Sequence, residues 1–244
     1  MAGLGAFEGL VTVVAVVAGA VASVSGFGIG SLLTPTLALQ LDPRLAVAAV
    51  SVPHLAGTAL RFWMLRGHVD RGVLLTFGST SAAGAFAGAV AGAYVRPGAL
   101  RFLVGAMLVV VGASEIGGWL RRMRFDGPSA WVAGAASGLF GGLVGNQGGL
   151  RAAAMLGFDL PKASFVATAT AIALVVDAAR MPVYAFTDGA RLRALAPLIL
   201  LATTGVVAGT LVGERVLSAI PERVFRLVVA ALLAGLGLLV IGTA

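Results

Sequence analysis

Long stretches without charge constrain this chain more than any other feature. Five of them, among 244 residues, contain no Asp, Glu, Lys or Arg: residues 9–41, 72–95, 127–150, 194–213 and 227–244. A membrane-spanning helix needs about 20 mostly apolar residues. Shorter apolar stretches fill the gaps near residues 45–66, 98–120 and 161–186. We therefore expect an all-α, polytopic transmembrane helical bundle of about eight hydrophobic segments joined by short loops.

Composition excludes an ordinary soluble domain. Hydrophobic residues make up 59% of the chain and charged residues 11%, and the mean hydropathy is +1.02. Soluble domains are about one quarter charged, so lipid must cover most of this surface. The net charge of +7 comes mainly from arginines at segment ends, which indicates membrane topology and headgroup contact and not nucleic acid. Cysteine is absent, which excludes disulfides and thiol chemistry.

Weak internal similarity indicates a duplication. The turn Asp42-Pro43-Arg44 has a counterpart 118 positions later, at Asp159-Leu160-Pro161-Lys162, and Arg61 recurs as Arg180. Glycines spaced by four residues also recur, and this spacing lets two helix backbones approach closely. They are Gly84, Gly88 and Gly92, then Gly205, Gly209 and Gly213. We expect residues 1–127 and 128–244 to form two pseudo-symmetric, four-segment transmembrane repeats within one membrane unit.

The first segment of each repeat is expected to be broken or re-entrant. Residues 9–41 would span about 50 Å as one straight helix, against a hydrocarbon core of about 30 Å. Glycines interrupt this segment at residues 26–30, ahead of Pro35, and the second repeat carries GGLVGNQGG at 141–149. Interrupted segments at matching places indicate a transporter site, and the amides of a half-helix N-terminus suit an anion. An ordinary kinked helix contact is the alternative.

Arginine placement favours an inverted arrangement of the repeats. If each broken segment turns back without crossing, nine loop bases share one side of the membrane and five face them. The nine are Arg66, Arg71, Arg121, Arg122, Arg124, Lys162, Arg215, Arg223 and Arg226, and the five are Arg44, Arg96, Arg101, Arg191 and Arg193. If all eight segments cross, the same bases divide evenly. The uneven distribution agrees better with the positive-inside rule.

Four stretches of the chain resemble the sulfite exporter TauE/SafE family. They read GFGIGSLLTPTLAL and DPRLAVAAVS in the first half, and GNQGGLRAAAML and LPKASFVATAT in the second. The resemblance covers nearly the whole chain. It implies a secondary transporter that exports small anions, such as sulfite or organosulfonates, across the bacterial inner membrane. The substrate would bind near mid-membrane between the two glycine-broken helices.

Arginines inside membrane segments are the leading site candidates. Arg151 follows the second break, and its guanidinium can bind two oxygens of a sulfite or sulfonate. A structural ion pair with Asp159 or Asp177 is the alternative. Arg61 and Arg180 occupy matching positions, although Trp63 and Tyr184 nearby indicate snorkelling to the interface.

Other candidates complete the predicted site. Asp177 and His54 are candidates for proton coupling, against an intrahelical Asp177–Arg180 ion pair and a buried structural histidine. The remaining substrate-binding candidates are small or polar residues at the breaks and one helix beyond them. They are Gly28, Gly30, Ser31, Thr34, Ser51, Asn146, Gln147, Gly148, Gly149 and Thr170.

Other function classes fit the sequence less well. Clustered metal ligands, a phosphate loop and a nucleophile elbow are absent from the sequence, so neither an enzyme nor a cofactor is expected. The expected partners are a small inorganic or organosulfur anion and the lipid bilayer, and a homodimer stays open. A passive anion channel is the closest alternative. A cation or metal transporter would need several buried carboxylates or histidines, and the chain offers little beyond Asp177 and His54.

Overall fold

The computed structural model describes residues 2–25, 28–123, 125, 127–145, 148–217 and 222–242, and every regular element among these residues is a helix. Up to residue 122 the elements are α1 (Ala2–Ser25), α2 (Ile29–Ala38), α3 (Pro43–Leu65), η1 (Arg66–His68), α4 (Arg71–Val73), η2 (Leu74–Gly78), α5 (Ser79–Gly92), α6 (Pro97–Gly117) and α7 (Trp119–Arg122). The later elements are α8 (Pro128–Val144), α9 (Gly148–Met155), η3 (Leu156–Phe158), α10 (Lys162–Ala194), α11 (Ala196–Leu217) and α12 (Glu222–Gly242).

The outer surface of these helices is apolar. Large side chains such as Leu75, Val132 and Leu200 are exposed, an arrangement that water disfavours and hydrocarbon accepts. Within the described residues, six helices are long and apolar enough to cross a membrane. The apolar stretches Ile29–Ala38 and Leu227–Gly242 are shorter. The chain is therefore a multi-pass helical membrane protein, as its composition predicts.

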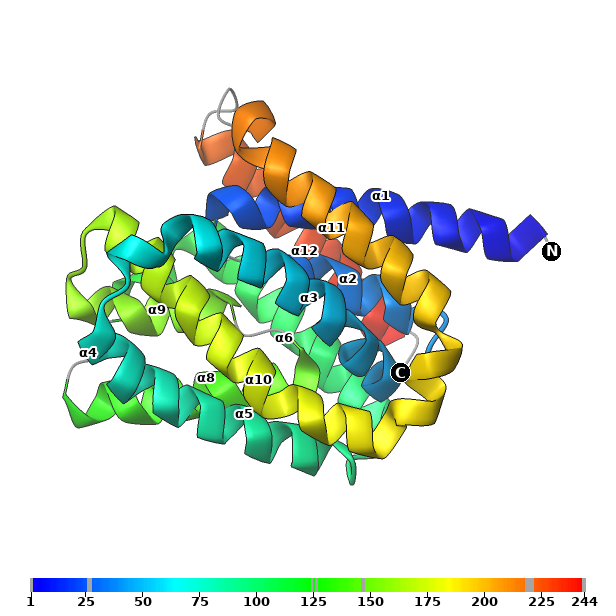
Figure 1. The fold of residues 1–244 in the computed structure, drawn as a ribbon, viewed down its shortest axis with the longest axis horizontal. Coiled ribbons are helices and arrows are strands. Elements are labelled where there is room, and N and C mark those ends of the chain that lie inside the picture. The colour runs from blue at the N-terminus through cyan, green and yellow to red at the C-terminus, as the bar shows by residue number, and fades with distance from the viewer. Residues whose placement is uncertain are drawn as a thin grey trace.

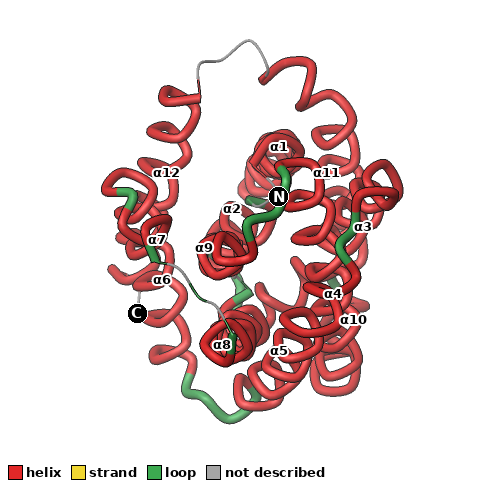
Figure 2. The backbone as a smooth tube through the Cα atoms, turned by 90° about the vertical axis from the view of Figure 1, so that its left-hand side faces the viewer, coloured by secondary structure: helices red, strands yellow, loops and turns green. Residues whose placement is uncertain are grey.

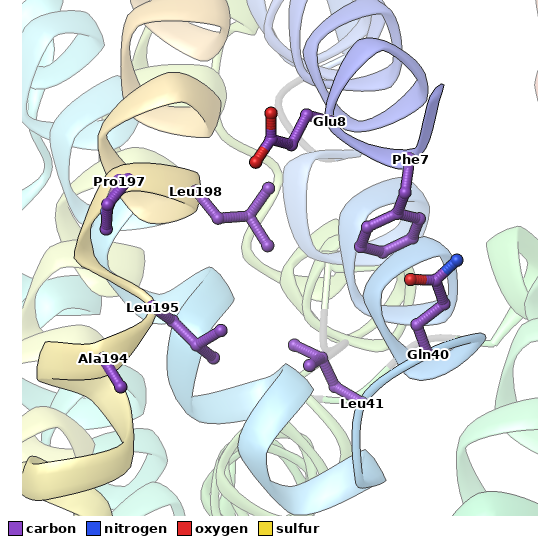
Figure 3. A pocket seen from close by; sticks show the side chains of 8 residues that line it. All are labelled: Phe7, Glu8, Gln40, Leu41, Ala194, Leu195, Pro197 and Leu198. Carbon is purple, nitrogen blue, oxygen red and sulfur yellow. The ribbon is translucent and has the colours of Figure 1, made fainter. Parts of the chain in front are cut away.

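The chain starts with a helical hairpin made of α1 and α2. The two helices contact each other, and Gly28 enters α2 with a φ of 136°, a value that favours glycine. Phe7 near the start of α1 and Leu41 just beyond α2 line the same cavity of about 370 Å³ (Figure 3). The hairpin therefore returns to the edge of the molecule at which it begins.

A second hairpin consists of α8 and α9. Gly145 ends α8 in the left-handed conformation, with a φ of 72°, and its N–H donates to the carbonyl of Gly141. Gly157, just beyond α9, lies against the backbone of Phe125, just ahead of α8, so closely that a Cβ would overlap it. This hairpin also returns to its starting edge.

The helices form three layers when seen end-on (Figure 2). One layer holds α6, α7 and α12, the middle row holds both hairpins, and the third holds α3, α4, α5, α10 and α11. The first arm of each hairpin packs against a helix from the other part of the chain, α1 against α11 and α8 against α5 (Figure 1). In the same way α6 packs against α12 and α3 against α10. The two hairpins therefore lie between helices from both parts of the sequence.

Glycines produce the closest of these contacts. At each of four glycines a Cβ would overlap or press on a backbone carbonyl of the facing helix, which confirms the packing role that their spacing predicts. The contacts are Gly84 with Ala135, Gly88 with Leu139, Gly205 with Thr12 and Gly209 with Val16. Residue numbers increase together along both pairs, so α5 runs parallel to α8 and α11 runs parallel to α1.

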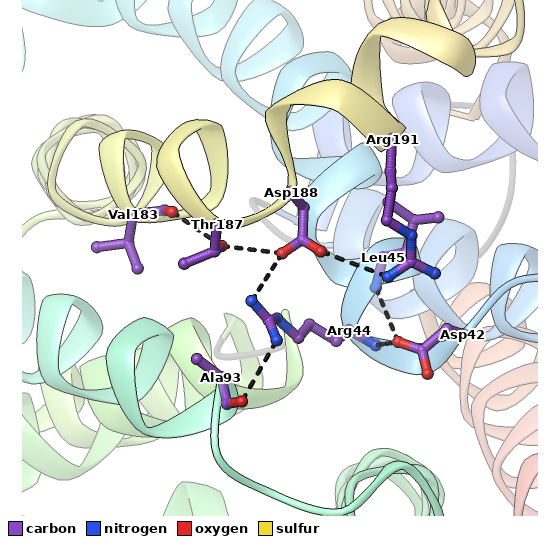
Figure 4. Close-up of polar contacts among 8 residues, drawn as sticks. All are labelled: Asp42, Arg44, Leu45, Ala93, Val183, Thr187, Asp188 and Arg191. Carbon is purple, nitrogen blue, oxygen red and sulfur yellow. Dashed lines mark hydrogen bonds and ion pairs between the residues drawn. The ribbon is translucent and has the colours of Figure 1, made fainter.

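A polar network joins the start of α3 to the end of α10 (Figure 4). Asp42 caps α3 by accepting hydrogen bonds from the N–H groups of Arg44 and Leu45. Arg44 forms a 3.1 Å ion pair with the buried carboxylate of Asp188 and donates to the carbonyl of Ala93 beyond α5. Arg44, for which the sequence predicted only a role in membrane topology, therefore connects α3 to α10 and to the end of α5.

Adding a methyl group at the α11–α1 contact should destabilise the protein. Gly209→Ala places a Cβ against the α1 backbone at Val16 and Ala20, and overpacking of this kind costs about 1–3 kcal/mol. We expect a lower midpoint in thermal unfolding of the detergent-solubilised protein. Gly235→Ala is the matched control, because a Cβ there meets nothing within 4 Å. Equal midpoints for the two variants would contradict this packing.

Candidate functional site

The tips of the two hairpins meet. A Cβ at Gly30 would overlap the carbonyl oxygen of Gly145, and a Cβ at Gly145 would lie 3.1 Å from the Thr34 hydroxyl. Gly30 is the second residue of α2, and Gly145 closely precedes α9. The N-termini of α2 and α9 therefore approach the same region. Amides in the first turn of a helix have no partner within that helix and carry partial positive charge.

Two buried arginines tie the central helices to these hairpins. Nη1 of Arg61, on α3, donates to the carbonyl of Ala22 near the end of α1. Nη1 of Arg180, on α10, donates to the carbonyl of Gly141 near the end of α8, over 2.7 Å. Each arginine follows its carbonyl by 39 residues. Arg61 is 5% exposed and Arg180 2%, so snorkelling to the interface is wrong for both.

Asp177 connects α10 to α3. Its Oδ1 accepts from Nε and Nη2 of Arg180, at 3.0 and 2.7 Å, and its Oδ2 lies 2.6 Å from Nδ1 of His54. The Asp177 side chain is 0% exposed, whereas that of His54 is 14% exposed. The intrahelical ion pair considered for Asp177 is therefore present, and the carboxylate contacts His54 as well. Every nitrogen of the Arg180 guanidinium already donates to a protein oxygen.

Arg151 has more unpaired donors than the other two arginines: in the described structure Arg61 leaves only Nε buried without a partner, and every nitrogen of Arg180 is paired. It lies in the first turn of α9, is 2% exposed, and its Nε and Nη1 have no hydrogen-bond partner among the described residues. The charges that act on it are those of Arg61, Asp177 and Arg180. The ion pair with Asp177 that the sequence allowed is absent from the described structure. Two donors of Arg151 are therefore directed into the protein without an acceptor.

The cluster has excess positive charge. Arg61, Arg151 and Arg180 are buried around the single carboxylate of Asp177, which leaves two uncompensated positive charges while His54 is neutral. Burying an unpaired charge costs several kcal/mol. This arrangement favours a bound anion, because an anion supplies both the missing charge and the missing acceptors.

The hydroxyl groups predicted for the site differ in whether they already donate a hydrogen bond within the protein. The Thr34 hydroxyl is buried, lacks a hydrogen-bond partner within the described structure and lies beside Gly145. Ser51 and Thr170 are buried but donate to the carbonyls of Ala48 and Val166 in their own helices. Ser31 is buried in the first turn of α2. Thr34 is therefore the hydroxyl best placed to donate to a ligand.

The remaining predicted residues belong to the two glycine breaks. Gly28 precedes α2, and Gly148 and Gly149 begin α9. Asn146 and Gln147 lie outside the described residues.

Tyr184 corrects one sequence interpretation. It is 4% exposed and donates to the carbonyl of Gly142, so its assignment to the interface is wrong. Trp63 is 68% exposed, with Arg66 stacked 3.6 Å from its ring centroid, as the interface interpretation expected. Arg180 and Tyr184 are four residues apart and therefore lie on one helix face. This spacing could have indicated that Tyr184 is buried beside Arg180.

The fold and the cluster define a multi-pass helical membrane protein with a buried cationic centre between two hairpins. The family described as sulfite exporter TauE/SafE matches residues 11–240. The chain belongs to this family, as its motifs predict, and is therefore a membrane transport protein. No curated protein and no solved structure matches the chain.

Removing the carboxylate of the cluster should destabilise the fold. Asp177→Ala leaves Arg180 unpaired beside Arg61 and Arg151, and breaking a buried ion pair costs about 3–5 kcal/mol. We expect a large fall in thermal stability. Arg191→Ala is the control, because Arg191 is 53% exposed in its pair with Asp188 and such pairs contribute at most about 1 kcal/mol. A smaller effect for Asp177→Ala than for the control would contradict the central role of this carboxylate.

Proposed function

We propose that the protein is a secondary transporter that exports small oxyanions, such as sulfite or organosulfonates, across the bacterial inner membrane. The observation that carries this proposal is the buried guanidinium of Arg151, whose Nε and Nη1 lack acceptors among the described residues at the N-terminus of α9. The family match supports a sulfite or related anion as the substrate. If the protein itself supplied acceptors for Nε and Nη1 of Arg151, these donors could not bind a transported ligand. The oxygens of an oxyanion can accept hydrogen bonds from both.

The substrate would bind near mid-membrane between the hairpin tips. One oxyanion can accept from Nε and Nη1 of Arg151 through two of its oxygens, the bidentate geometry that guanidinium groups favour. The first-turn amides of α2 and α9 and the Thr34 hydroxyl offer further donors to the remaining oxygens. Arg61 contributes a further positive charge close by, whereas Arg180 binds Asp177 and the α8 carbonyl of Gly141.

Two inverted repeats, residues 1–127 and 128–244, would form this site. Support comes from helix direction: Gly105 lies against Gly237, whereas Gly112 lies against Ala230. The partners run in opposite order, so α6 and α12, the last helices of the two repeats, are antiparallel. The matching ties of Arg61 and Arg180 support the same relation. In this arrangement each hairpin enters from its own side of the membrane and turns back near the middle.

The excess positive charge separates this function from a cation or metal transporter. A cation or metal transporter would place a net negative charge at its site, and the described cluster has the opposite sign. A passive anion channel would use the same arginines. We favour a carrier, because the site is buried: Arg151 is 2% exposed and all ten residues of α2 are buried.

Truncating Arg151 should weaken anion binding. Charge-assisted hydrogen bonds contribute about 1.5–3 kcal/mol each, so we expect Arg151→Ala to lower sulfite affinity by roughly 10- to 100-fold or more. Calorimetric titration of the purified protein measures this directly. Arg66→Ala is the matched control, since Arg66 is exposed and stacks on Trp63. If sulfite binds Arg151→Ala as tightly as the control, Arg151 is not part of the site.

Transport assays should distinguish a carrier from a channel. Proteoliposomes loaded with unlabelled sulfite should accumulate external labelled sulfite without net current, because a carrier with one buried site exchanges one anion for another. Protein-free liposomes set the background. A steady sulfite current, with no stimulation of labelled uptake by internal sulfite, would establish the channel alternative.

A further inference from the structure

The orientation of His54 determines which of its ring nitrogens is available to a ligand. Nδ1 lies 2.6 Å from Oδ2 of Asp177, and Oδ1 of the same carboxylate accepts two hydrogen bonds from Arg180. An ionised carboxylate can only accept, so Nδ1 must carry the hydrogen. The contact that one imidazole nitrogen makes decides the state of the other. In neutral His54, therefore, Nε2 is a hydrogen-bond acceptor.

The free edge of the ring faces the hairpin tips. Cδ2, the carbon bonded to Nε2, lies 3.9 Å from the Cβ position at Gly30, the residue that contacts Gly145. The His54 side chain is 14% exposed, more than Asp177 at 0%, Arg180 at 2% or Arg61 at 5%. His54 is thus the most accessible of these side chains, and it lies beside the region in which we place the anion.

The charged groups around His54 oppose one another. From α10, Asp177 favours a positive imidazole, whereas Arg180 from α10 and Arg151 from α9 disfavour it. On α3 itself, Arg61 adds a further positive charge to the cluster. Of the other helices packed against α3, α2 and α8 contain no ionisable side chain, α11 contains only Glu214 and Arg215, near its end, and α6 contains Arg101 and Glu115. With one carboxylate among three guanidinium groups, the cluster opposes a further positive charge on His54, and a bound anion would relieve that repulsion.

We propose that one proton binds with each oxyanion, held on Nε2 of His54. An oxyanion beside neutral His54 would face the lone pair of Nε2, which is repulsive. Once Nε2 takes a proton from solvent, it becomes a donor, and the imidazolium lies between the carboxylate of Asp177 and the bound anion. The anion also offsets the repulsion from Arg151 and Arg180. This inference rests on the proposed anion site and adds proton coupling to it.

Proton coupling changes the charge that moves in each cycle. A dianion such as sulfite, bound with one proton, carries a single net negative charge through the membrane. A membrane potential that is negative inside still drives this charge outward.

Counting protons during binding tests the inference. Sulfite is added to the detergent-solubilised protein in weak buffer with a pH indicator, at about pH 8, where an unperturbed imidazole is neutral. Injection into buffer alone gives the background, and calorimetry gives the bound amount. We expect close to one proton taken up per sulfite bound by the wild-type protein. His54→Gln should bind sulfite without proton uptake, because its amide can donate without titrating.

His68→Gln is the matched control, since His68 is the other histidine of the chain and is exposed. It should take up protons as the wild type does. Sulfite binding without proton uptake by the wild-type protein would overturn the coupling while leaving the anion site intact, and this measurement needs no variant to fold. Uptake that persists in His54→Gln would overturn the assignment to His54. Failure of sulfite to bind the wild-type protein would overturn the proposed function itself.

Discussion

The pairing of Asp177 with Arg180 is the interaction on which the rest of the centre depends. The carboxylate holds Arg180 in place, and Arg180 then reaches the carbonyl of Gly141 in α8. Its second oxygen holds His54, so α3, α8 and α10 are joined through one buried acid. Without this negative charge, three buried guanidinium groups would repel one another in a medium of low dielectric constant. One carboxylate cannot neutralise three guanidinium groups, and the proposed anion site depends on the positive charge that remains.

Close backbone contact provides the second constraint. Between membrane helices the hydrophobic effect contributes little, because lipid is as apolar as leucine, so packing decides which helices associate. Glycines on α5 and α11 let each helix lie directly against a hairpin arm, and Gly30 lets α2 reach Gly145. The hairpins are therefore held by helices from the opposite part of the chain. Their broken tips bring the amides of α2 and α9 to the region where Arg151 lacks acceptors within the described structure.

Much of this arrangement could be predicted from the residues. The predictions that were wrong or incomplete share a physical cause, which is contact between segments distant in the sequence. Helical membrane residence and family membership follow from uncharged runs and from motifs, which are local properties. The recurrence of Arg61 as Arg180 predicted related roles, and both donate to a carbonyl 39 residues upstream. The spacing of three residues indicated the ion pair of Asp177 with Arg180, but nothing in the pattern of residues indicated that Gly141 accepts from the remaining nitrogen. The assignment of Tyr184 to the membrane interface was wrong, because an aromatic residue near the end of an apolar segment gives the same sequence pattern in two cases. It can face lipid headgroups, or it can donate to a buried carbonyl.

Membrane residence and helical structure could be predicted from the residues alone, because both depend on the apolar length of single segments. Which charges are neutralised depends instead on the contacts that the folded bundle makes. Arg151 and Arg180 are both arginines near the middle of apolar segments, yet Arg180 donates from all three of its nitrogens to protein oxygens, whereas Arg151 has two vacant donors among the described residues. Asp177, which pairs with two of the Arg180 nitrogens, lies on the same helix, but the Gly141 carbonyl that accepts from the third nitrogen comes from α8. The excess positive charge, to which α3, α9 and α10 each contribute an arginine, is therefore a property of the assembled bundle and of no single segment.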